Sequence, residues 1–313
     1  MTKIRYNQKG LFRDKLTITP IGGLGNQLFI YFAGRFMADK LRKNLEIDIS
    51  LVSVVGSTHV GDIGCLQLPG KFVDKVYKRN TLFRLIDRLD KKIMRHFEIY
   101  QWMRLHIFGY FQSRELGFEQ TLEGLKRISS INGYFQTWRY FEYYATNKKE
   151  YFRLDDPSSW FKEMCKSAEA IKPIALHIRR GDYTLLQEDF GLLSLEYYAK
   201  SIQYARALHS TSEIWVFSDD IALAEQLLTP LNNPSIKYIS SPTYSTPIES
   251  LLLISECKVI ITANSTFSYW AGLIQSPAGY VITPEKWFKN RRDPVDLIPP
   301  TWIKIPSSWV GLN

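Results

Sequence analysis

The second half of the chain alternates short apolar runs with amphipathic segments. Apolar runs that end in polar residues predict strands, and segments with apolar side chains at helical spacing predict helices. The expected strands cover residues 173–180, 213–220, 235–240, 259–264 and 279–284, and the expected helices cover 194–209, 221–229, 246–258 and 267–275. This β-α-β order predicts a parallel, doubly wound sheet, in which ligands bind at the carboxyl ends of the strands.

The first half begins in the same way, which predicts a second α/β unit. The expected elements are a strand at 15–21, a glycine-rich turn at 22–27, a helix at 28–43, a strand at 44–50, and one or two amphipathic helices over 71–108. We therefore expect two domains, residues 1–152 and 153–313. No internal repeat or low-complexity linker marks the boundary between them.

Composition narrows the class of protein. With 313 residues, 45% hydrophobic and 23% charged side chains, the chain is typical of a soluble globular protein and not of a disordered or disulfide-stabilised one. Three cysteines far apart in sequence are expected to be reduced thiols, and no apolar leader follows the N-terminus, so we expect a cytoplasmic protein. The uncharged segment 259–284 is interrupted by polar residues, which favours two buried elements over a membrane span.

The charge balance points to an anionic partner. Lys and Arg exceed Asp and Glu by nine, and residues 71–104 hold ten Lys and Arg against four acids. A solvated helical face is the commonest explanation of such a stretch. Peripheral contact with an anionic membrane is the alternative. Nucleic acid is not expected as a partner, because the aromatic residues there follow helical spacing and no RNA-binding motif.

The sharpest local feature is the run HIRRGDY at 177–183. An apolar strand that enters two adjacent arginines puts at least one guanidinium at the carboxyl edge of the sheet. The planar donor fork of arginine suits a diphosphate, so we favour Arg179 and Arg180 as diphosphate ligands. A structural ion pair with Asp182 is the alternative.

Three further turns carry groups that suit a nucleotide. The glycine-rich turn at 22–27 lets main-chain N–H groups approach a ligand, with Gly23 and Asn26 as contacts, although Asn26 as a helix N-cap is an equal alternative. Small polar donors follow a strand at Asn264, Ser265, Thr266 and Phe267, where hydroxyl and N–H groups can hold phosphate oxygens. Asp219 ends another strand and can accept hydrogen bonds from a ribose or guanine, with an N-cap as the alternative.

The sequence offers no conventional metal site. There is no strict DxD motif, no HExxH, and the five histidines show no metal-ligand spacing. We therefore expect no metal, with the diphosphate charge neutralised by arginine and helix ends.

Four motifs together resemble the family-11 α-1,2-fucosyltransferases, particularly the bacterial ones. They are GGLGNQLF (22–29), GYFQTWRYF (133–141), HIRRGDY (177–183) and ANSTFSYWAGLI (263–274), in an order and spacing that cover roughly residues 15–290. The resemblance implies a GT-B fold of two Rossmann-like domains facing a central cleft, with the acceptor on the N-terminal domain and GDP-sugar on the C-terminal one. It implies inverting transfer from GDP-β-L-fucose to the 2-hydroxyl of a terminal β-galactoside, without metal.

The resemblance also implies roles for individual residues. Arg179 and Arg180 match the arginines that hold the donor diphosphate, and Asp182 is the acid of the same motif. Ser265, Thr266 and Phe267 match a phosphate-side turn, and Asn26 matches the asparagine of a turn across the cleft. Asp182 is the first candidate for the general base and His177 the second, while Arg180 stabilises the leaving group. The acceptor is expected to be an O-antigen-like glycan, with a lipid-linked form at the inner face of the membrane as one possibility.

Overall fold

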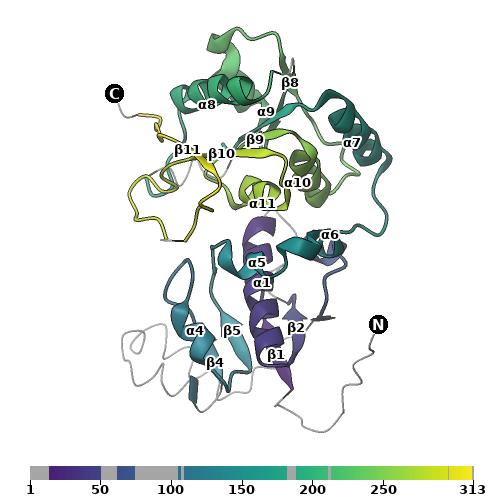
Figure 1. Ribbon diagram of the computed structural model, residues 1–313, viewed down its shortest axis with the longest axis vertical. Helices are drawn as coiled ribbons and strands as arrows, with labels where there is room; N and C mark the ends of the chain where they lie inside the picture. The colour runs from purple at the N-terminus through teal and green to yellow at the C-terminus, as the bar shows by residue number, and fades with distance from the viewer. Residues whose placement is uncertain are drawn as a thin grey trace.

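The computed structural model describes residues 14–50, 62–74, 105–106, 109–181, 188–210, 213–294 and 296–311. Its two halves form two α/β units stacked one above the other, each with a parallel sheet at its centre (Figure 1). The alternation of apolar runs and amphipathic segments therefore predicted the class of fold correctly.

The N-terminal unit holds a sheet of five strands in the order β3-β2-β1-β5-β4, and all of its pairings are parallel. Its strands are β1 (Lys15–Ile18), β2 (Asn44–Asp48), β3 (Lys71–Val73), β4 (Tyr110–Gln112) and β5 (Ser130–Asn132). Its helices are α1 (Leu24–Lys40), α4 (Gln120–Gly124), α5 (Arg139–Glu142) and α6 (Lys148–Tyr151), with 3-10 turns η1 (Asp62–Cys65) and η3 (Ala145–Asn147).

The C-terminal unit holds a parallel sheet of six strands in the order β11-β10-β9-β6-β7-β8. Its strands are β6 (Ile174–Ile178), β7 (Ile214–Ser218), β8 (Ile236–Tyr238), β9 (Val259–Ile261), β10 (Tyr280–Pro284) and β11 (Ile303–Ile305). Its helices are α7 (Ser159–Ile171), α8 (Leu195–Leu208), α9 (Ile221–Leu228), α10 (Pro247–Glu256) and α11 (Thr266–Ile274), with the 3-10 turn η5 (Thr229–Leu231).

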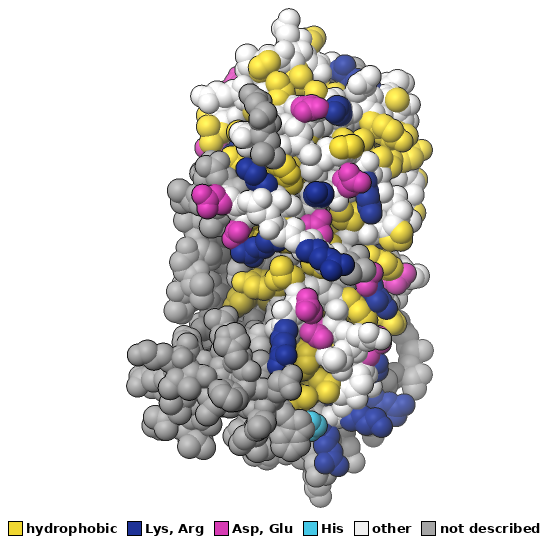
Figure 2. Space-filling model, turned by 90° about the vertical axis from the view of Figure 1, so that its left-hand side faces the viewer, with side chains coloured by type: hydrophobic (Ala, Val, Ile, Leu, Met, Phe, Trp, Pro, Cys, Tyr) yellow, Lys and Arg dark blue, Asp and Glu magenta, His cyan; other side chains and the backbone are white. Residues whose placement is uncertain are grey.

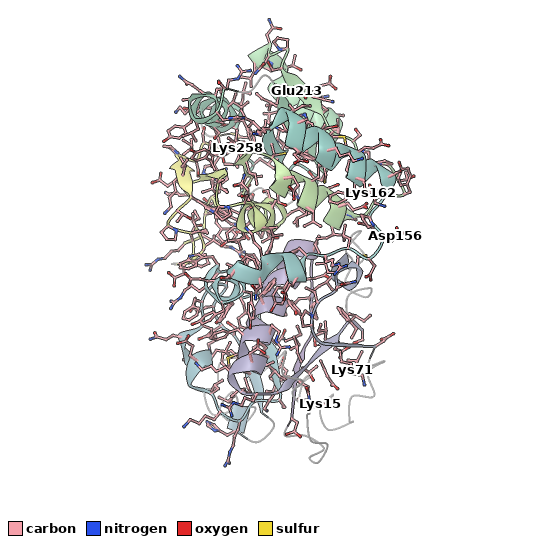
Figure 3. The ribbon with its side chains drawn as sticks, turned by 45° about the vertical axis from the view of Figure 1, so that its right-hand side comes forward. Lys15, Lys71, Asp156, Lys162, Glu213 and Lys258 are labelled. Atoms are coloured by element: carbon pink, nitrogen blue, oxygen red, sulfur yellow. The ribbon has the colours of Figure 1, made fainter. Side chains whose placement is uncertain are left out.

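The two sheets direct the carboxyl ends of their strands toward each other. Lys15 and Lys71, the first residues of β1 and β3, lie toward the far end of the N-terminal unit (Figure 3). Glu213 and Lys258, just before β7 and β9, lie in the upper part of the other unit, away from the junction (Figure 3). The turns that follow the strands therefore meet where the units join, which is where open α/β sheets bind ligands. This two-unit arrangement is the GT-B type of fold.

Helices α1 and α11 form the junction between the units (Figure 1). The indole Nε1 of Trp270 donates a hydrogen bond to the carbonyl oxygen of Gly25 at 2.8 Å. The Trp270 ring also stacks on Phe32 with centroids 5.1 Å apart and 24° between the planes. Helix α1 is buried around most of its circumference, so it carries apolar side chains on nearly all of its faces. One hydrophobic cluster includes residues of both units.

Several expected boundaries were wrong. Helix α1 begins at Leu24, so Gly25, Asn26 and Gln27 lie in its first turn and not in a preceding loop, and its N-cap is Gly23, not Asn26. Residues Lys71–Val73 form strand β3 and not the start of a helix, because they pair with β2. Residues 75–104 lie outside the described residues.

Other expectations agree with the structure. Ser194, where the helix over 194–209 was expected to begin, directly precedes α8, and its hydroxyl donates to Ser308 Oγ at 2.8 Å. Cys65, Cys165 and Cys257 are free thiols. Within the described ranges, no helix is both long and apolar enough to cross a membrane, and the segment 259–284 folds into β9, α11 and β10.

Candidate active site

Two arginines directly follow β6 at the carboxyl edge of its sheet. Arg180 is only 5% exposed, and its Nη2 donates to the carbonyl oxygen of Leu193 at 2.7 Å. Its other terminal nitrogen, Nη1, is buried and has no hydrogen-bond partner among the described residues. An unpaired buried donor is unfavourable by about 1–3 kcal/mol, so an acceptor placed beside this nitrogen would stabilise the site.

Asp219, which directly follows β7, holds in place the turn formed by Arg179, Arg180 and Gly181, called here the arginine turn. Its Oδ1 accepts a hydrogen bond from the main-chain N–H of Arg180 at 2.9 Å, and its Oδ2 lies 3.2 Å from Nε of Arg179. A Cβ atom at Gly181 would collide with the same carboxylate, so glycine is needed there for the close approach. One carboxylate against two guanidinium groups leaves these three side chains with one net positive charge, which favours an anion.

The neighbouring acid has a separate role. Asp220 is the N-cap of α9, where its Oδ1 accepts a hydrogen bond from the N–H of Leu223 at 2.9 Å. The N-cap expected at this strand end is therefore Asp220 and not Asp219, and a contact of Asp219 with ribose or guanine stays a prediction. Asp220 caps the helix, and the carboxylate of Asp219 faces the arginine turn, so its interactions seen here are with the protein.

His177 lies inside β6 and is 3% exposed. Its ring stacks on Phe267 of α11, with centroids 5.6 Å apart and 27° between the planes. Burial, with a smaller contribution from the nearby Arg179 charge, lowers the pKa of His177 to about 3. A group with such a low pKa has little tendency to accept a proton near neutral pH, so packing against Phe267 fits His177 better than the role of general base.

The turn before α11 is built from buried polar residues. Ser265 is the N-cap of α11, and its Oγ accepts a hydrogen bond from the N–H of Phe267 at 3.4 Å. The Nδ2 of Asn264 donates to the carbonyl oxygens of Phe190, Gly191 and Trp287 at 2.9, 3.3 and 3.2 Å. Asn264 thus joins two loops to the strand end and commits its amide nitrogen to the protein.

The glycine turn of the N-terminal unit meets the α11 turn directly. A Cβ atom at Gly25 would lie 2.5 Å from the carbonyl carbon of Thr266, so only glycine allows the two helix starts to approach this closely. Gly22 has a φ of +75°, which also favours glycine. A Cβ at Gly23, in contrast, would meet nothing within 4 Å, so its main chain borders open space.

The structure therefore brings most of the sequence-predicted residues to one place. Contacts between Arg180 and Asp219, His177 and Phe267, and Gly25 and Thr266 link the turns after β6, β7, β9 and β1. Asp182 lies outside the described residues. The face turned to the viewer in Figure 2 carries Lys and Arg side chains, with acids among them, at the mid-height where the units meet.

Sequence reasoning missed Gln136, which reaches the glycine turn from the loop after β5. Its Nε2 donates to Oδ1 of Asn26 at 3.0 Å. The motif GYFQTWRYF, which contains Gln136, was visible in the sequence. A glutamine does not by itself indicate a binding site, and only the fold places Gln136 beside Asn26.

Two α/β units, whose parallel sheets direct their strand ends to a junction with a cationic turn, have the architecture of the GT-B glycosyltransferases. The family model of glycosyl transferase family 11 matches residues 79–306. The chain belongs to this family.

Two curated relatives come from Escherichia coli. An alpha-1,2-colitosyltransferase is 27% identical over 297 residues, covering 91% of this chain and 96% of the relative. The O-antigen biosynthesis glycosyltransferase WbnK is 28% identical over 316 residues, covering 91% of this chain and 98% of the relative.

Solved structures show more distant likenesses. The fucosyltransferase NodZ from Bradyrhizobium is 16% identical with a TM-score of 0.49, covering 83% of this chain and 93% of that one. POFUT1 in complex with GDP-fucose is 14% identical with a TM-score of 0.48, covering 85% of this chain and 96% of that one. Such scores are too low for a conclusion about activity.

Proposed function

We propose that the protein transfers L-fucose from GDP-β-L-fucose to the 2-hydroxyl of a terminal β-galactoside, with inversion to an α-1,2 linkage, in the synthesis of an O-antigen-like glycan. The observation that carries the proposal is the buried arginine turn after β6, whose Arg180 Nη1 has no partner among the described residues. The motifs around this turn match those of the fucosyltransferases of the family. The relative WbnK, named for O-antigen biosynthesis, supports the glycan class.

The proposed reaction is a single displacement. The acceptor O2 attacks the anomeric carbon of fucose, the bond from that carbon to the GDP oxygen breaks, and the acceptor proton passes to a general base. Arg179 and Arg180 stabilise the negative charge that builds on GDP, an electrostatic contribution of the kind that accounts for about 10²–10³-fold per donor in other enzymes. Asp182 stays the proposed base from its place in the motif.

Metal independence is part of the proposal. The positive turn at Arg179 and Arg180 and the amino end of α11 at Ser265 supply the charge that a metal would otherwise provide. Transfer in the presence of EDTA at the same rate as in its absence is the expected result. A loss of transfer on chelation, restored by a divalent cation, would contradict it.

A second donor is favoured by one comparison. The relative named alpha-1,2-colitosyltransferase indicates that GDP-L-colitose is a candidate, because colitose is fucose without its 3-hydroxyl. The same site would serve either sugar, since the GDP part is common to both. Competition between the two donors at equal concentration decides which one the protein prefers.

The test is transfer from GDP-fucose, GDP-colitose, GDP-mannose and UDP-galactose to lactose and to Galβ1,3 and Galβ1,4 disaccharides. We expect an α-1,2-fucosylated product that mass spectrometry and linkage analysis identify. A colitosylated product alone would favour the second donor. Tight GDP binding without transfer to any acceptor would revive a non-catalytic, nucleotide-binding role.

Peripheral membrane contact through the basic stretch 71–104 is a separate proposal that rests on its charge. Vesicles with anionic lipid are expected to retain the protein during flotation, and neutral vesicles are not. Equal behaviour with both vesicle types would leave the solvated helical face as the explanation.

A further inference from the structure

The amide of Gln136 is buried and only half satisfied. Gln136 is 8% exposed, and its Nε2 donates to Oδ1 of Asn26 at 3.0 Å. Its Oε1 is buried without a hydrogen-bond partner among the described residues. Buried polar atoms are nearly always paired in folded proteins, so an exception in a protein that binds a ligand points to a group that the ligand supplies.

The main chain around Gln136 is held rigidly in an unfavourable conformation. Phe135 has a φ of +51° although it is a bulky, fully buried side chain. The N–H of Gln136 donates to Leu116 O, and Oγ1 of Thr137 donates to Asp296 O at 2.8 Å. Left-handed conformations at such residues persist only where the surroundings enforce them, and they concentrate at functional sites.

The unpaired oxygen belongs to the region where the two units meet. Asn26 lies in the first turn of α1, next to Gly25, which contacts Thr266 of α11. A second unpaired oxygen, Oε1 of the fully buried Gln27, comes from the same turn. Gly23 borders open space one step before the helix. Two unpaired acceptor oxygens thus come from residues in, or bonded to, the first turn of α1, on the N-terminal side of the junction.

The chemistry of these oxygens selects the ligand. An amide oxygen accepts hydrogen bonds and is repelled by phosphate oxygens, whereas a sugar hydroxyl can donate to it. We propose that Gln136, held in place by Asn26, accepts a hydrogen bond from a hydroxyl of a sugar ring at the junction. The proposal rests on the proposed function for the identity of the sugars, and it makes Gln136 a specificity-determining residue.

The hydroxyl has two possible sources, the donor hexose and the acceptor galactoside, and binding measurements separate them. Calorimetry of wild type and Gln136→Met uses GDP, GDP-fucose, GDP-colitose, and lactose in the presence of GDP. Methionine keeps the length of the side chain and removes the amide. We expect unchanged affinity for GDP and about tenfold weaker binding of either GDP-fucose or lactose, in keeping with the loss of one buried hydrogen bond.

Sugars that lack one hydroxyl identify the group that is bound. One ligand is expected to lose affinity in Gln136→Met. Its form without the contacted hydroxyl should bind wild type about tenfold more weakly than the parent sugar does. The same form should bind Gln136→Met no more weakly than the parent sugar does. GDP-colitose tests the 3-hydroxyl of the donor, and 3-, 4- and 6-deoxygalactosides test the acceptor. A purely structural role of Gln136 would weaken all sugars alike and produce no such coupling.

Gln275→Met is the matched control. Gln275 is 6% exposed, and its Nε2 donates to Cys257 O at 2.8 Å at the other end of α11. This variant is expected to melt at a lower temperature and to keep the sugar affinities of wild type. Gln136→Asn, which shortens the amide by one methylene, serves as a second variant if Gln136→Met does not fold, with the same expected pattern.

Unchanged binding of both GDP-fucose and lactose by a folded Gln136 variant would overturn the proposal. So would weakened binding without coupling to any single hydroxyl. Failure of the proposed function is distinguished from this result, because it appears as absence of transfer by wild type in the separate turnover assay.

Discussion

The turn after β6 and the turn after β1 occupy corresponding places in their two sheets but are built in opposite ways. In the arginine turn, the carboxylate of Asp219 forms an ion pair with Arg179 and accepts a hydrogen bond from the main-chain N–H of Arg180. The glycine turn has no charged side chain, and its polar groups are the amides of Asn26, Gln27 and, from a later loop, Gln136. One turn presents fixed positive charge, and the other presents neutral hydrogen-bonding groups.

If the proposed function holds, this difference assigns the diphosphate of the donor to one turn and the sugar rings to the other. A diphosphate needs charge that is already oriented, because reorienting dipoles during the reaction would raise the barrier. Sugar hydroxyls are uncharged and can be distinguished by amide groups, whose donor and acceptor atoms have fixed positions. Of the four predictions that follow, the first two test the charged turn and the last two test the packing and the titration of residues at the junction, beginning with the largest expected effect.

Arg180→Ala should reduce transfer by about 10²–10³-fold, because the variant loses a buried, preoriented positive charge beside the leaving group. Arg180→Lys should recover only part of this loss, since an ammonium group cannot form the planar donor fork. Steady-state kinetics with GDP-fucose measures both variants.

The control for this prediction is Arg291→Ala. Arg291 is about half exposed and pairs with Asp189, so its removal should change transfer by less than twofold. Transfer by Arg180→Ala within threefold of wild type would contradict the assignment of the diphosphate to this turn.

Asp219→Asn should lower the rate of transfer about tenfold. The amide oxygen can still accept from the N–H of Arg180, but the charge that orients Arg179 is lost, which disturbs a charge-assisted contact. Because Asp219 acts through the arginines, the turnover number should fall further than GDP affinity does. Kinetics combined with calorimetry separates the two quantities.

Asp220, the residue next to Asp219, provides the control variant. Asp220→Asn should leave both transfer and stability close to wild type, since asparagine is an equally good N-cap for α9. Equal losses in the two variants would mean that Asp219 has no special relation to the arginine turn.

Gly25→Ala should destabilise the protein by about 1–3 kcal/mol, because its Cβ would overlap the main chain of Thr266 and neither helix start can move without disturbing the buried junction. Thermal unfolding measures the change. Gly23→Ala, two residues earlier, should lower the unfolding temperature by less, because its Cβ meets nothing and only the poorer N-capping by alanine reduces stability. Similar unfolding temperatures for the two variants would argue against the tight contact between the units.

His177 should give the stability of the protein a modest pH dependence. Its pKa of about 3 in the folded chain lies below the ordinary value of 6.5, so only the unfolded chain binds the proton between these values. The contribution of His177 to the free energy of unfolding is therefore fully present above pH 6.5, and it is lost as the pH falls toward 3.

The variant His177→Phe removes this titration while keeping a ring against Phe267. Denaturant unfolding at several pH values should show a shallower loss of stability below pH 6.5 in the variant than in wild type. Parallel pH profiles would show that the imidazole is not held neutral by burial.

Local sequence patterns predicted most of the C-terminal unit because its strands are continuous apolar runs. Strands β6, β7 and β9 are buried on both faces, and such strands consist almost entirely of apolar residues. Strands β3, β4 and β5 are only partly buried and contain polar residues, so no continuous apolar run marks them, and their pairing with distant partners decides them. The early start of α1 was hidden because glycine in its first turn resembles a loop.

The sequence by itself determined the alternation of strands and helices, the arginine pair after β6, and the polar turn before α11. These are local properties, since a few consecutive residues carry them. Only the tertiary structure decided that Asp219 orients the arginines, that Gly25 contacts Thr266, and that Gln136 meets Asn26. These contacts join residues 39 to 241 positions apart in the chain. The first and the third form within one unit, when β6 pairs with β7 and β1 pairs with β5, whereas Gly25 meets Thr266 only when the two units pack through α1 and α11.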